Sequence, residues 1–279
     1  MSEAEQADSA VHVAVVQLCS GDDRSVNLTA ASEAVREAAG RGAQVVCLPE
    51  MWPFIGSDAA KVAGAEDLSG PSVSAMQELA NELGLWLFAG SFAELSELQG
   101  RVYNCSPVIA PTGRVVAVYR KIHLFDIDIA GGPSFLESNT VSPGTQAVVV
   151  DCPLGRVGLT VCYDLRFPQL FEGLRRAGAE VFMVPAAFTA HTGRSHWELL
   201  LRARAVEQQC WVVASDQGGH HNPKRESYGN SMIVDPWGEV VARLGSEPNV
   251  AIARVDRERT VRVRRELPCF SHRRSFADC

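Results

Sequence analysis

Short apolar runs alternate with amphipathic segments along almost the whole chain. The runs are rich in β-branched residues, as buried strands are, and the segments between them repeat apolar residues at helical spacing. Residues 27–40 are an example, with Gly40 as the expected C-cap. Alternation of this kind predicts an α/β fold. The expected strands cover residues 12–18, 43–48, 85–92, 181–185 and 210–215, and the expected helices cover 27–40, 72–83, 169–178 and 196–209.

Two tight turns predict antiparallel hairpins within this pattern. Residues 102–110 and 114–119 flank Pro111-Thr112-Gly113, and a second turn contains Asp235-Pro236-Trp237-Gly238. Hairpins beside parallel strands favour mixed sheets over purely parallel ones.

Three polar segments are expected to be loops, at residues 125–143, 186–195 and 217–228. Loops of this length inside a compact domain are commonly functional. No linker, repeat or low-complexity segment interrupts the chain, so we expect one domain over residues 11–256.

The two ends differ in charge from the body of the chain. Residues 1–10 are acidic and polar, lack the features of a signal peptide, and are expected to be disordered. Residues 257–279 form a basic segment interleaved with Glu258 and Glu266, and we expect a tail that packs on a partner subunit.

Composition excludes several classes of protein. The net charge of −7 argues against a nucleic-acid partner. The sequence contains no run of 18 apolar residues, so no membrane-spanning helix is predicted. Eight scattered cysteines without a C-x-x-C pair predict neither a disulfide framework nor a zinc site, which favours the reducing cytoplasm. We expect no cofactor and no metal, and we interpret His220 and His221 as surface histidines.

Three reactive side chains stand where apolar strands end. They are Glu50, Lys121 and Cys162, the last after residues 156–161 and before the polar turn 163–168. A strand-to-turn position lifts a side chain off the sheet edge while both neighbours hold it still. Acid, amine and thiol at strand ends make a candidate nucleophilic site.

These residue types suit hydrolysis of an amide through an acyl-enzyme. Cys162 would be the nucleophile, Glu50 the general base and then acid, and Lys121 the stabiliser of the oxyanion and of the thiolate. The backbone N–H of Tyr163 is a candidate second oxyanion donor. Taken singly, each side chain also has a structural explanation, as a buried thiol, a turn-forming acid or a solvated amine, and their spacing alone establishes no motif.

At these residues the chain resembles the nitrilase superfamily of carbon–nitrogen hydrolases. The motifs are Leu48-Pro49-Glu50, then Tyr119-Arg120-Lys121-Ile122-His123-Leu124, then Cys162-Tyr163-Asp164-Leu165-Arg166-Phe167-Pro168. The resemblance covers residues 11–254 and implies a four-layer α-β-β-α sandwich with two mixed β-sheets. It also implies a homodimer or a larger homo-oligomer, paired through helices.

The resemblance implies roles for residues beside these three. Glu137 matches a second glutamate of the family, which positions Lys121 or the substrate. Asp164 and Arg166 are interpreted as a charged pair that fixes the turn after Cys162.

Within the superfamily the chain resembles the branch that contains omega-amidase and deaminated-glutathione amidase. Residues 217–229 and Gly132-Pro133 are closer to the second enzyme, whereas residues 125–128 are closer to the first. The implied reaction is hydrolysis of a small 2-oxo-acid amide, foremost deaminated glutathione, to 2-oxoglutarate and Cys-Gly. Alternatives are 2-oxoglutaramate, 2-oxosuccinamate, N-carbamoyl amino acids and aliphatic amides.

A 2-oxo acid carries a carboxylate that needs a cation or N–H donors. His191, Arg194 and Lys224, on two of the polar segments, are candidates to bind it. Two other functions remain as alternatives. A non-catalytic binding protein is disfavoured by the intact set of acid, amine and thiol, and a Cys–His protease by the lack of a histidine in a suitable strand followed by Asn.

Overall fold

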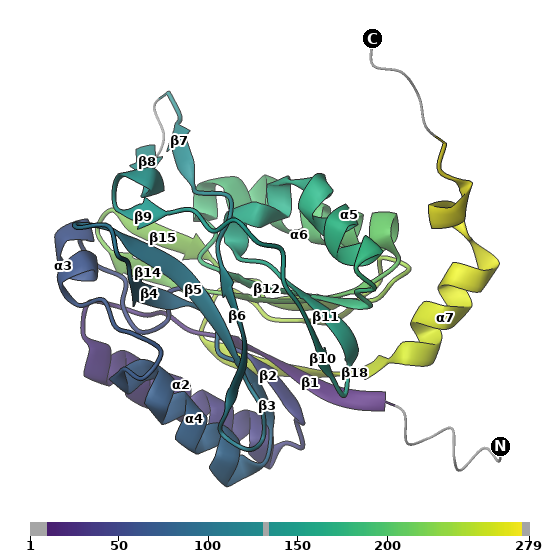
Figure 1. Ribbon diagram of the computed structural model, residues 1–279, viewed down its shortest axis with the longest axis horizontal. Coiled ribbons are helices and arrows are strands. Elements are labelled where there is room, and N and C mark those ends of the chain that lie inside the picture. Colours follow the sequence, from purple (N-terminus) through teal and green to yellow (C-terminus); the bar gives the residue numbers. More distant parts are fainter. Residues whose placement is uncertain (1–9, 131–133, 275–279) are drawn as a thin grey trace.

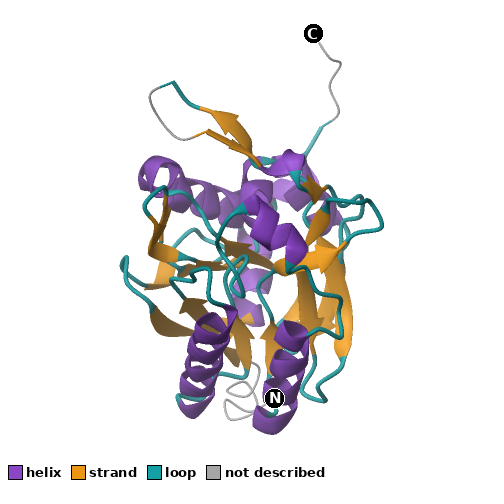
Figure 2. Ribbon diagram, turned by 90° about the vertical axis from the view of Figure 1, so that its left-hand side faces the viewer, coloured by secondary structure: helices purple, strands orange, loops and turns teal. Residues whose placement is uncertain are grey.

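Two β-sheets pack face to face, and helices cover the outer face of each, so the chain forms four layers (Figure 1). The structure is a computed structural model, and it describes residues 10–130 and 134–274. Figure 2 shows helices on both outer sides of the paired sheets. The expected four-layer sandwich is confirmed, and so is the mixed character of both sheets.

The first sheet contains the strands from the N-terminal half and one returning strand from the C-terminal half. Its order is β18-β1-β2-β3-β5-β4, and β6 and β9 also pair with β5. Helices α2 and α4 cover its outer face (Figure 1). The bounds are β1 Ala10–Gln17, α2 Arg24–Gly40, β2 Val45–Cys47, α3 Asp58–Ala63, α4 Pro71–Leu83, β3 Trp86–Phe88, β4 Phe92–Leu95, β5 Val102–Ile109, β6 Val115–Arg120, β9 Val141–Ser142 and β18 Asn249–Asp256.

The second sheet has the order β10-β11-β12-β13-β16-β17, and helices α5 and α6 cover its outer face. Two small hairpins, β7–β8 and β14–β15, stand apart from both sheets. The bounds are β7 Asp126–Asp128, β8 Ser134–Leu136, β10 Val149–Cys152, β11 Gly155–Leu159, α5 Pro168–Arg176, β12 Val181–Ala186, α6 Ala190–Gln208, β13 Trp211–Asp216, β14 Gly218–Asn222, β15 Arg225–Tyr228, β16 Met232–Val234, β17 Val240–Arg243 and α7 Arg257–Glu266, with short 3-10 turns at Glu137–Asn139, Cys162–Arg166 and Cys269–His272.

The sequence of β1 explains how one strand serves two layers. Successive side chains of a strand point to opposite faces of its sheet. Val13 and Val15 therefore enter the core between the two sheets, whereas Ala14 and Val16 pack in the core that contains Val35 of α2. A strand buried on both faces is nearly continuously apolar, and in β1 this holds for residues 13–16, between the exposed His12 and the buried Gln17.

The polar segments expected to be loops contain regular structure. Residues 125–143 form β7, β8 and β9, and residues 217–228 form the β14–β15 hairpin. Apart from β9, whose Val141 belongs to a hydrophobic core cluster, these short strands lie outside the two main sheets and lack the apolar alternation that would have revealed them. Helix α6 also begins at Ala190 rather than at residue 196. The His, Thr, Gly and Ser residues of its first turns are weak helix formers, and tertiary contacts hold them: a Cβ on Gly193 would lie 2.4 Å from Tyr228.

The two chain ends are only partly described. Residues 1–9 and 275–279, and the Gly132-Pro133 pair, lie outside the described residues. Residues 257–266 form helix α7, whose Thr260 and Val263 are buried, and Arg264 donates a hydrogen bond to the Gln209 carbonyl. Packing of this segment on a partner subunit stays a prediction. Within the described ranges, none of the helices has both the length and the apolar stretch needed to cross a membrane.

Gly90 allows the backbone after β3 to pack closely against the segment between β2 and Glu50. Gly90, between β3 and β4, has a φ of 57° and touches the chain so closely that a Cβ would lie 2.0 Å from the Pro49 carbonyl oxygen. This left-handed residue divides the expected strand 85–92 into β3 and β4. The backbone can come this close to Pro49 because glycine has no side chain.

We therefore expect Gly90→Ala to destabilise the protein by at least about 2 kcal/mol, because it adds a left-handed alanine and a steric overlap. Urea unfolding followed by circular dichroism measures the loss. Gly40→Ala at the end of α2 is the matched control, since nothing lies within 4 Å of its added Cβ. Equal unfolding midpoints for the two variants would contradict this reading of Gly90.

Candidate functional site

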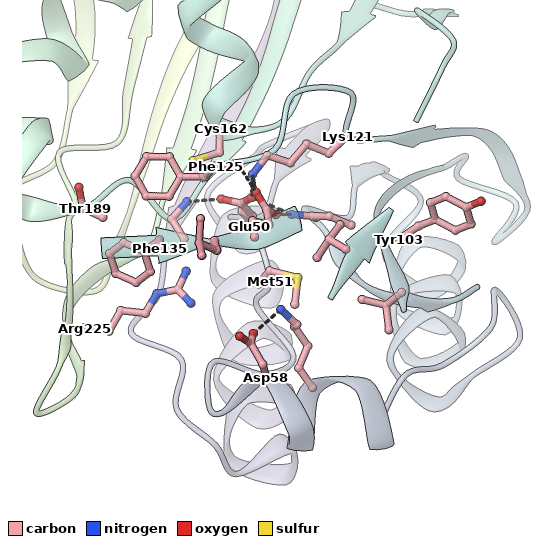
Figure 3. Close-up of a pocket in the computed structure, with 17 residues that line it drawn as sticks. Glu50, Met51, Asp58, Tyr103, Lys121, Phe125, Phe135, Cys162, Thr189 and Arg225 are labelled. Carbon is pink, nitrogen blue, oxygen red and sulfur yellow. Dashed lines mark hydrogen bonds and ion pairs between the residues drawn. The ribbon is translucent and has the colours of Figure 1, made fainter. Parts of the chain in front are cut away.

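A cavity lies where strand ends of the two sheets meet (Figure 3). Glu50 follows β2 by three residues, and Lys121 directly follows β6, both in the first sheet. Cys162 follows β11 of the second sheet by three residues. All three side chains line this cavity, although they are far apart in the sequence.

Lys121 is the centre of a buried charge network. Its Nζ lies 2.8 Å from Glu50 Oε1 and 2.8 Å from Glu137 Oε2, and its side chain is 2% exposed. Asn104 on β5 joins the two carboxylates, donating to Glu50 Oε1 at 2.8 Å and to Glu137 Oε1 at 3.2 Å. The network is buried and hydrogen-bonded, as stable buried charges must be.

The second oxygen of Glu50 is bound to the second sheet. The Ala187 N–H, just after β12, donates to Glu50 Oε2 at 2.8 Å. The Gln217 side chain, just after β13, donates to the Glu50 carbonyl at 3.1 Å. Glu50 is therefore oriented from both sheets, which leaves its carboxylate little rotational freedom.

The turn at Cys162 is backbone-strained. Cys162 has a φ of 48°, a left-handed conformation that non-glycine residues adopt at a cost of about 1–2 kcal/mol. The buried carboxylate of Asp164 holds this turn by accepting from the Val161 N–H at 2.8 Å and from the Tyr119 hydroxyl at 2.7 Å. It also contacts His123 Nδ1 at 2.7 Å. The thiol is thus fixed at the cavity, 7% exposed.

The prediction that Asp164 and Arg166 form a charged pair is wrong. The Asp164 carboxylate is occupied by backbone and aromatic-ring donors, and Arg166 instead contacts His196 Nδ1 at 3.2 Å and lies over the Phe188 ring. A 3-10 turn has three residues per turn, so side chains two residues apart point in different directions and the two charges diverge. Asp164 nevertheless stabilises the turn after Cys162, as expected.

Burial and the charge network set the protonation states. Burial and the Glu50 carboxylate raise the pKa of Cys162 well above its usual 9.0, against an opposing effect of Lys121. Burial raises the pKa of Glu50, but the effects of Lys121, Cys162 and Arg225 together outweigh it, and the net pKa lies below 4.5. Burial lowers the pKa of Lys121, but Glu137 and Glu50 raise it well above 10.5. At neutral pH the site therefore holds a thiol beside a carboxylate and an ammonium.

The structure brings most of the sequence-predicted site residues together. Glu50, Lys121, Glu137 and Cys162 all line the cavity. Tyr163 directly follows the thiol, and its ring packs edge-on against Phe125, with centroids 5.1 Å apart, and against Phe167. Its backbone N–H is thereby held next to Cys162.

The three candidate carboxylate-binding residues do not line the cavity. His191 and Arg194 lie exposed at the start of α6, and Lys224 lies exposed in the turn between β14 and β15. Their binding role stays a prediction. His220 is exposed as expected, but His221 is partly buried, contacts Ser20 and Ser227, and burial lowers its pKa to about 4.

Several cavity residues were missed from the sequence. Asn104 carried a usable signal, because a polar side chain inside an apolar strand needs a buried partner. Arg225 adjoins the candidate Lys224 but belongs to an unexpected strand. The others come from α3, β5, β8, β9 and the loops and include Asp58, Lys61, Tyr103, Phe125, Phe135 and Thr189.

Known proteins share this fold and sequence. The family model of carbon-nitrogen hydrolases matches residues 12–265. Human deaminated glutathione amidase is 47% identical over 267 residues, which cover 94% of this chain and 82% of that protein.

Two solved structures are also similar. The Caenorhabditis elegans NitFhit protein superposes with a TM-score of 0.88 at 39% identity, covering 95% of this chain and 65% of that one. Saccharomyces cerevisiae Nit3, a member of branch 10 of the nitrilase superfamily, superposes with a TM-score of 0.86 at 32% identity, covering 95% and 97%. The chain therefore belongs to the carbon-nitrogen hydrolase family, as its motifs predicted.

Proposed function

We propose that this hydrolase is a thiol amidase that works through an acyl-enzyme on Cys162. One observation carries the proposal: a buried carboxylate and a buried ammonium share a cavity with a thiol held in a strained turn. Glu50 is ionised and Cys162 protonated in the resting state, which is the starting condition for base-assisted attack.

Acylation needs one proton transfer in each direction. Glu50 takes the thiol proton as Cys162 Sγ bonds to the amide carbon, and the carbonyl oxygen becomes an oxyanion. Lys121 and the Tyr163 N–H stabilise that charge. The carbon–nitrogen bond then breaks as the proton on Glu50 passes to the leaving nitrogen, either directly or through Lys121, which donates its own proton and regains one from Glu50, and the amine departs.

Deacylation repeats the sequence with water. Glu50 removes a proton from water as the water oxygen attacks the thioester carbon, and the same oxyanion donors act again. Collapse breaks the carbon–sulfur bond, and the proton held by Glu50 returns to the thiolate. Glu137 positions Lys121 throughout, because its carboxylate lies 2.8 Å from the ammonium, as does that of Glu50.

The proposed substrate is a small 2-oxo-acid amide, and deaminated glutathione is the first choice. The support is that a human relative with 47% identity is named for this amidase activity. Hydrolysis of deaminated glutathione would release Cys-Gly and 2-oxoglutarate. The alternative within the same chemistry is 2-oxoglutaramate.

We also propose a homo-oligomer in a reducing compartment such as the cytoplasm. Leu199 and Val206 lie exposed on one face of α6, and Val206 lies against Gly238, the residue after the exposed Trp237; such apolar residues suit contact with a second copy of the chain. All seven cysteines among the described residues are free thiols, which suits a reducing compartment.

Replacing Cys162 with Ala should reduce kcat/KM by at least about 10⁴-fold, because the nucleophile is lost while its buried surroundings stay intact. Steady-state assays measure the loss, and mass spectrometry of the wild type should detect an acyl adduct on the peptide that contains Cys162. The control is Cys269→Ala, an exposed thiol in the last 3-10 turn. Turnover near the wild-type level in the Cys162 variant would refute the mechanism.

The pH profile of kcat/KM should be broad. Because the net pKa of Glu50 is lowered, its base form persists above that pKa and is lost only as the pH falls below its ordinary 4.5. Because the pKa values of Cys162 and Lys121 are raised, the alkaline limb should lie above 9.0. Circular dichroism at each pH separates inactivation from unfolding, and an acid limb between pH 6 and 7 would instead indicate a histidine base.

A substrate panel decides the acyl group. The wild type should cleave deaminated glutathione with a kcat/KM at least about tenfold above that for 2-oxoglutaramate, corresponding to about 1.4 kcal/mol of additional transition-state binding. An N-carbamoyl amino acid and an aliphatic nitrile serve as negative controls. Faster turnover of 2-oxoglutaramate would favour the alternative, and turnover of the controls alone would exclude both.

A further inference from the structure

The cavity contains three carboxylates and three cations, and one of the cations lacks a carboxylate partner. Two of the carboxylates hold Lys121, and the third pairs with Lys61 at 2.6 Å. Among the described residues, no carboxylate lies within 4.0 Å of the Arg225 guanidinium. The six side chains are Glu50, Asp58, Lys61, Lys121, Glu137 and Arg225.

Arg225 is held on a fixed support. It begins β15, which pairs with β14 in a separate hairpin. The Tyr228 N–H donates to the Phe188 carbonyl at 2.8 Å, and His221 Nδ1 contacts the Ser20 carbonyl oxygen at 2.7 Å. These contacts bind the hairpin to the body of the protein, so the position of Arg225 does not depend on a loose loop.

The guanidinium points into the cavity toward Glu50 (Figure 3). After burial and Lys121, which have the larger effects, Arg225 contributes to the pKa of Glu50 by lowering it. Its neighbour Lys224 is exposed in the preceding turn and lies outside the cavity. Of these two adjacent cations, Arg225 at the start of β15 lines the cavity, whereas Lys224 in the turn faces solvent.

We infer that Arg225 binds the carboxylate of the substrate's acyl group, at the end opposite the carbonyl carbon that Cys162 attacks. The inference rests on the proposed amidase function and extends it to a substrate class: amides whose acyl chain ends in a carboxylate, including the 2-oxo acid monoamides. An arginine is suited to this task because its planar guanidinium binds a carboxylate through two parallel hydrogen bonds. Arg225 has no carboxylate partner among the described residues, so its guanidinium N–H groups are available to bind a substrate carboxylate.

The assignment has a kinetic consequence. The acyl carboxylate remains at the same place in the substrate, in both tetrahedral intermediates and in the thioester. An interaction that is equal in ground state and transition state changes KM and leaves kcat nearly unaltered. Arg225 therefore acts in recognition, in contrast with Lys121, which binds the oxyanion that exists only during reaction.

The test compares an anionic amide with its neutral counterpart. The substrates are 2-oxoglutaramate and its methyl ester, which lacks the charge. In Arg225→Gln, KM for 2-oxoglutaramate should rise at least about 30-fold with kcat within about threefold, because truncating one partner of a partly buried charge pair commonly has an effect of this size or larger. KM for the ester should be unchanged. Arg225→Lys keeps the charge but loses the planar guanidinium, so its KM for 2-oxoglutaramate should lie between those of the wild type and Arg225→Gln.

Two further variants serve as comparisons. Arg114→Gln makes the same charge change in the exposed turn between β5 and β6, at the opposite end of β6 from Lys121, and should behave as the wild type. Lys224→Gln tests the neighbouring cation. The inference is overturned if Arg225→Gln leaves KM unchanged, if it impairs the ester equally, or if Lys224→Gln causes the larger rise.

A binding experiment separates this inference from the proposed function. In the Cys162→Ala background, calorimetry measures binding of 2-oxoglutarate, the acid product, with and without Arg225→Gln. At least about 30-fold weaker binding supports the role of Arg225 even if the wild type cleaves no 2-oxo amide, the result that would defeat the proposed function. Equal affinities overturn the role of Arg225 whatever the enzyme cleaves.

Discussion

The buried ion pairs of Lys121 are the interaction on which the site depends. An ammonium that is 2% exposed would lose its proton if it stood alone, because burial penalises the charged form. The carboxylates of Glu50 and Glu137 together prevent this, and each in turn accepts a hydrogen bond from Asn104. Removing one partner from such a network commonly costs about 3–5 kcal/mol, so the network holds its members in one arrangement.

This network also determines the state of the thiol. The Glu50 carboxylate beside Cys162 raises the pKa of the thiol, while Lys121 opposes that effect, so the proton stays on sulfur until a substrate arrives. An ionised carboxylate and a protonated thiol are thereby held together at neutral pH, which are the protonation states that the proposed mechanism requires of its base and nucleophile. The arrangement explains why a buried thiol with a raised pKa is compatible with nucleophilic chemistry: the required base is already ionised.

The sandwich makes this arrangement possible because the strand ends of its two sheets meet at one place. Glu50 and Lys121 come from the first sheet and Cys162 from the second, and the Ala187 N–H from the second sheet binds Glu50 across the gap. The Asp216 carboxyl, at the end of β13, accepts from the Phe188 N–H, and burial raises its pKa well above 3.8. Backbone and side-chain hydrogen bonds between the sheets thus fix the cavity at atomic distances.

The sequence by itself determined the α/β alternation, the strand-end positions of Glu50, Lys121 and Cys162, and, through resemblance, the place of Glu137. These follow from local patterns, because strand periodicity and turn residues are properties of neighbours along the chain. Only the tertiary structure decided which other side chains meet these four. Asn104 and Arg225 lie on strands that approach from elsewhere in the fold. That Arg225 lines the cavity, and Lys224 does not, depends on a hairpin that the sequence did not predict. Side chains that are tens of residues apart come together because of packing and because buried charges must be paired and hydrogen-bonded. The spacing of the residues along the sequence does not reveal either requirement.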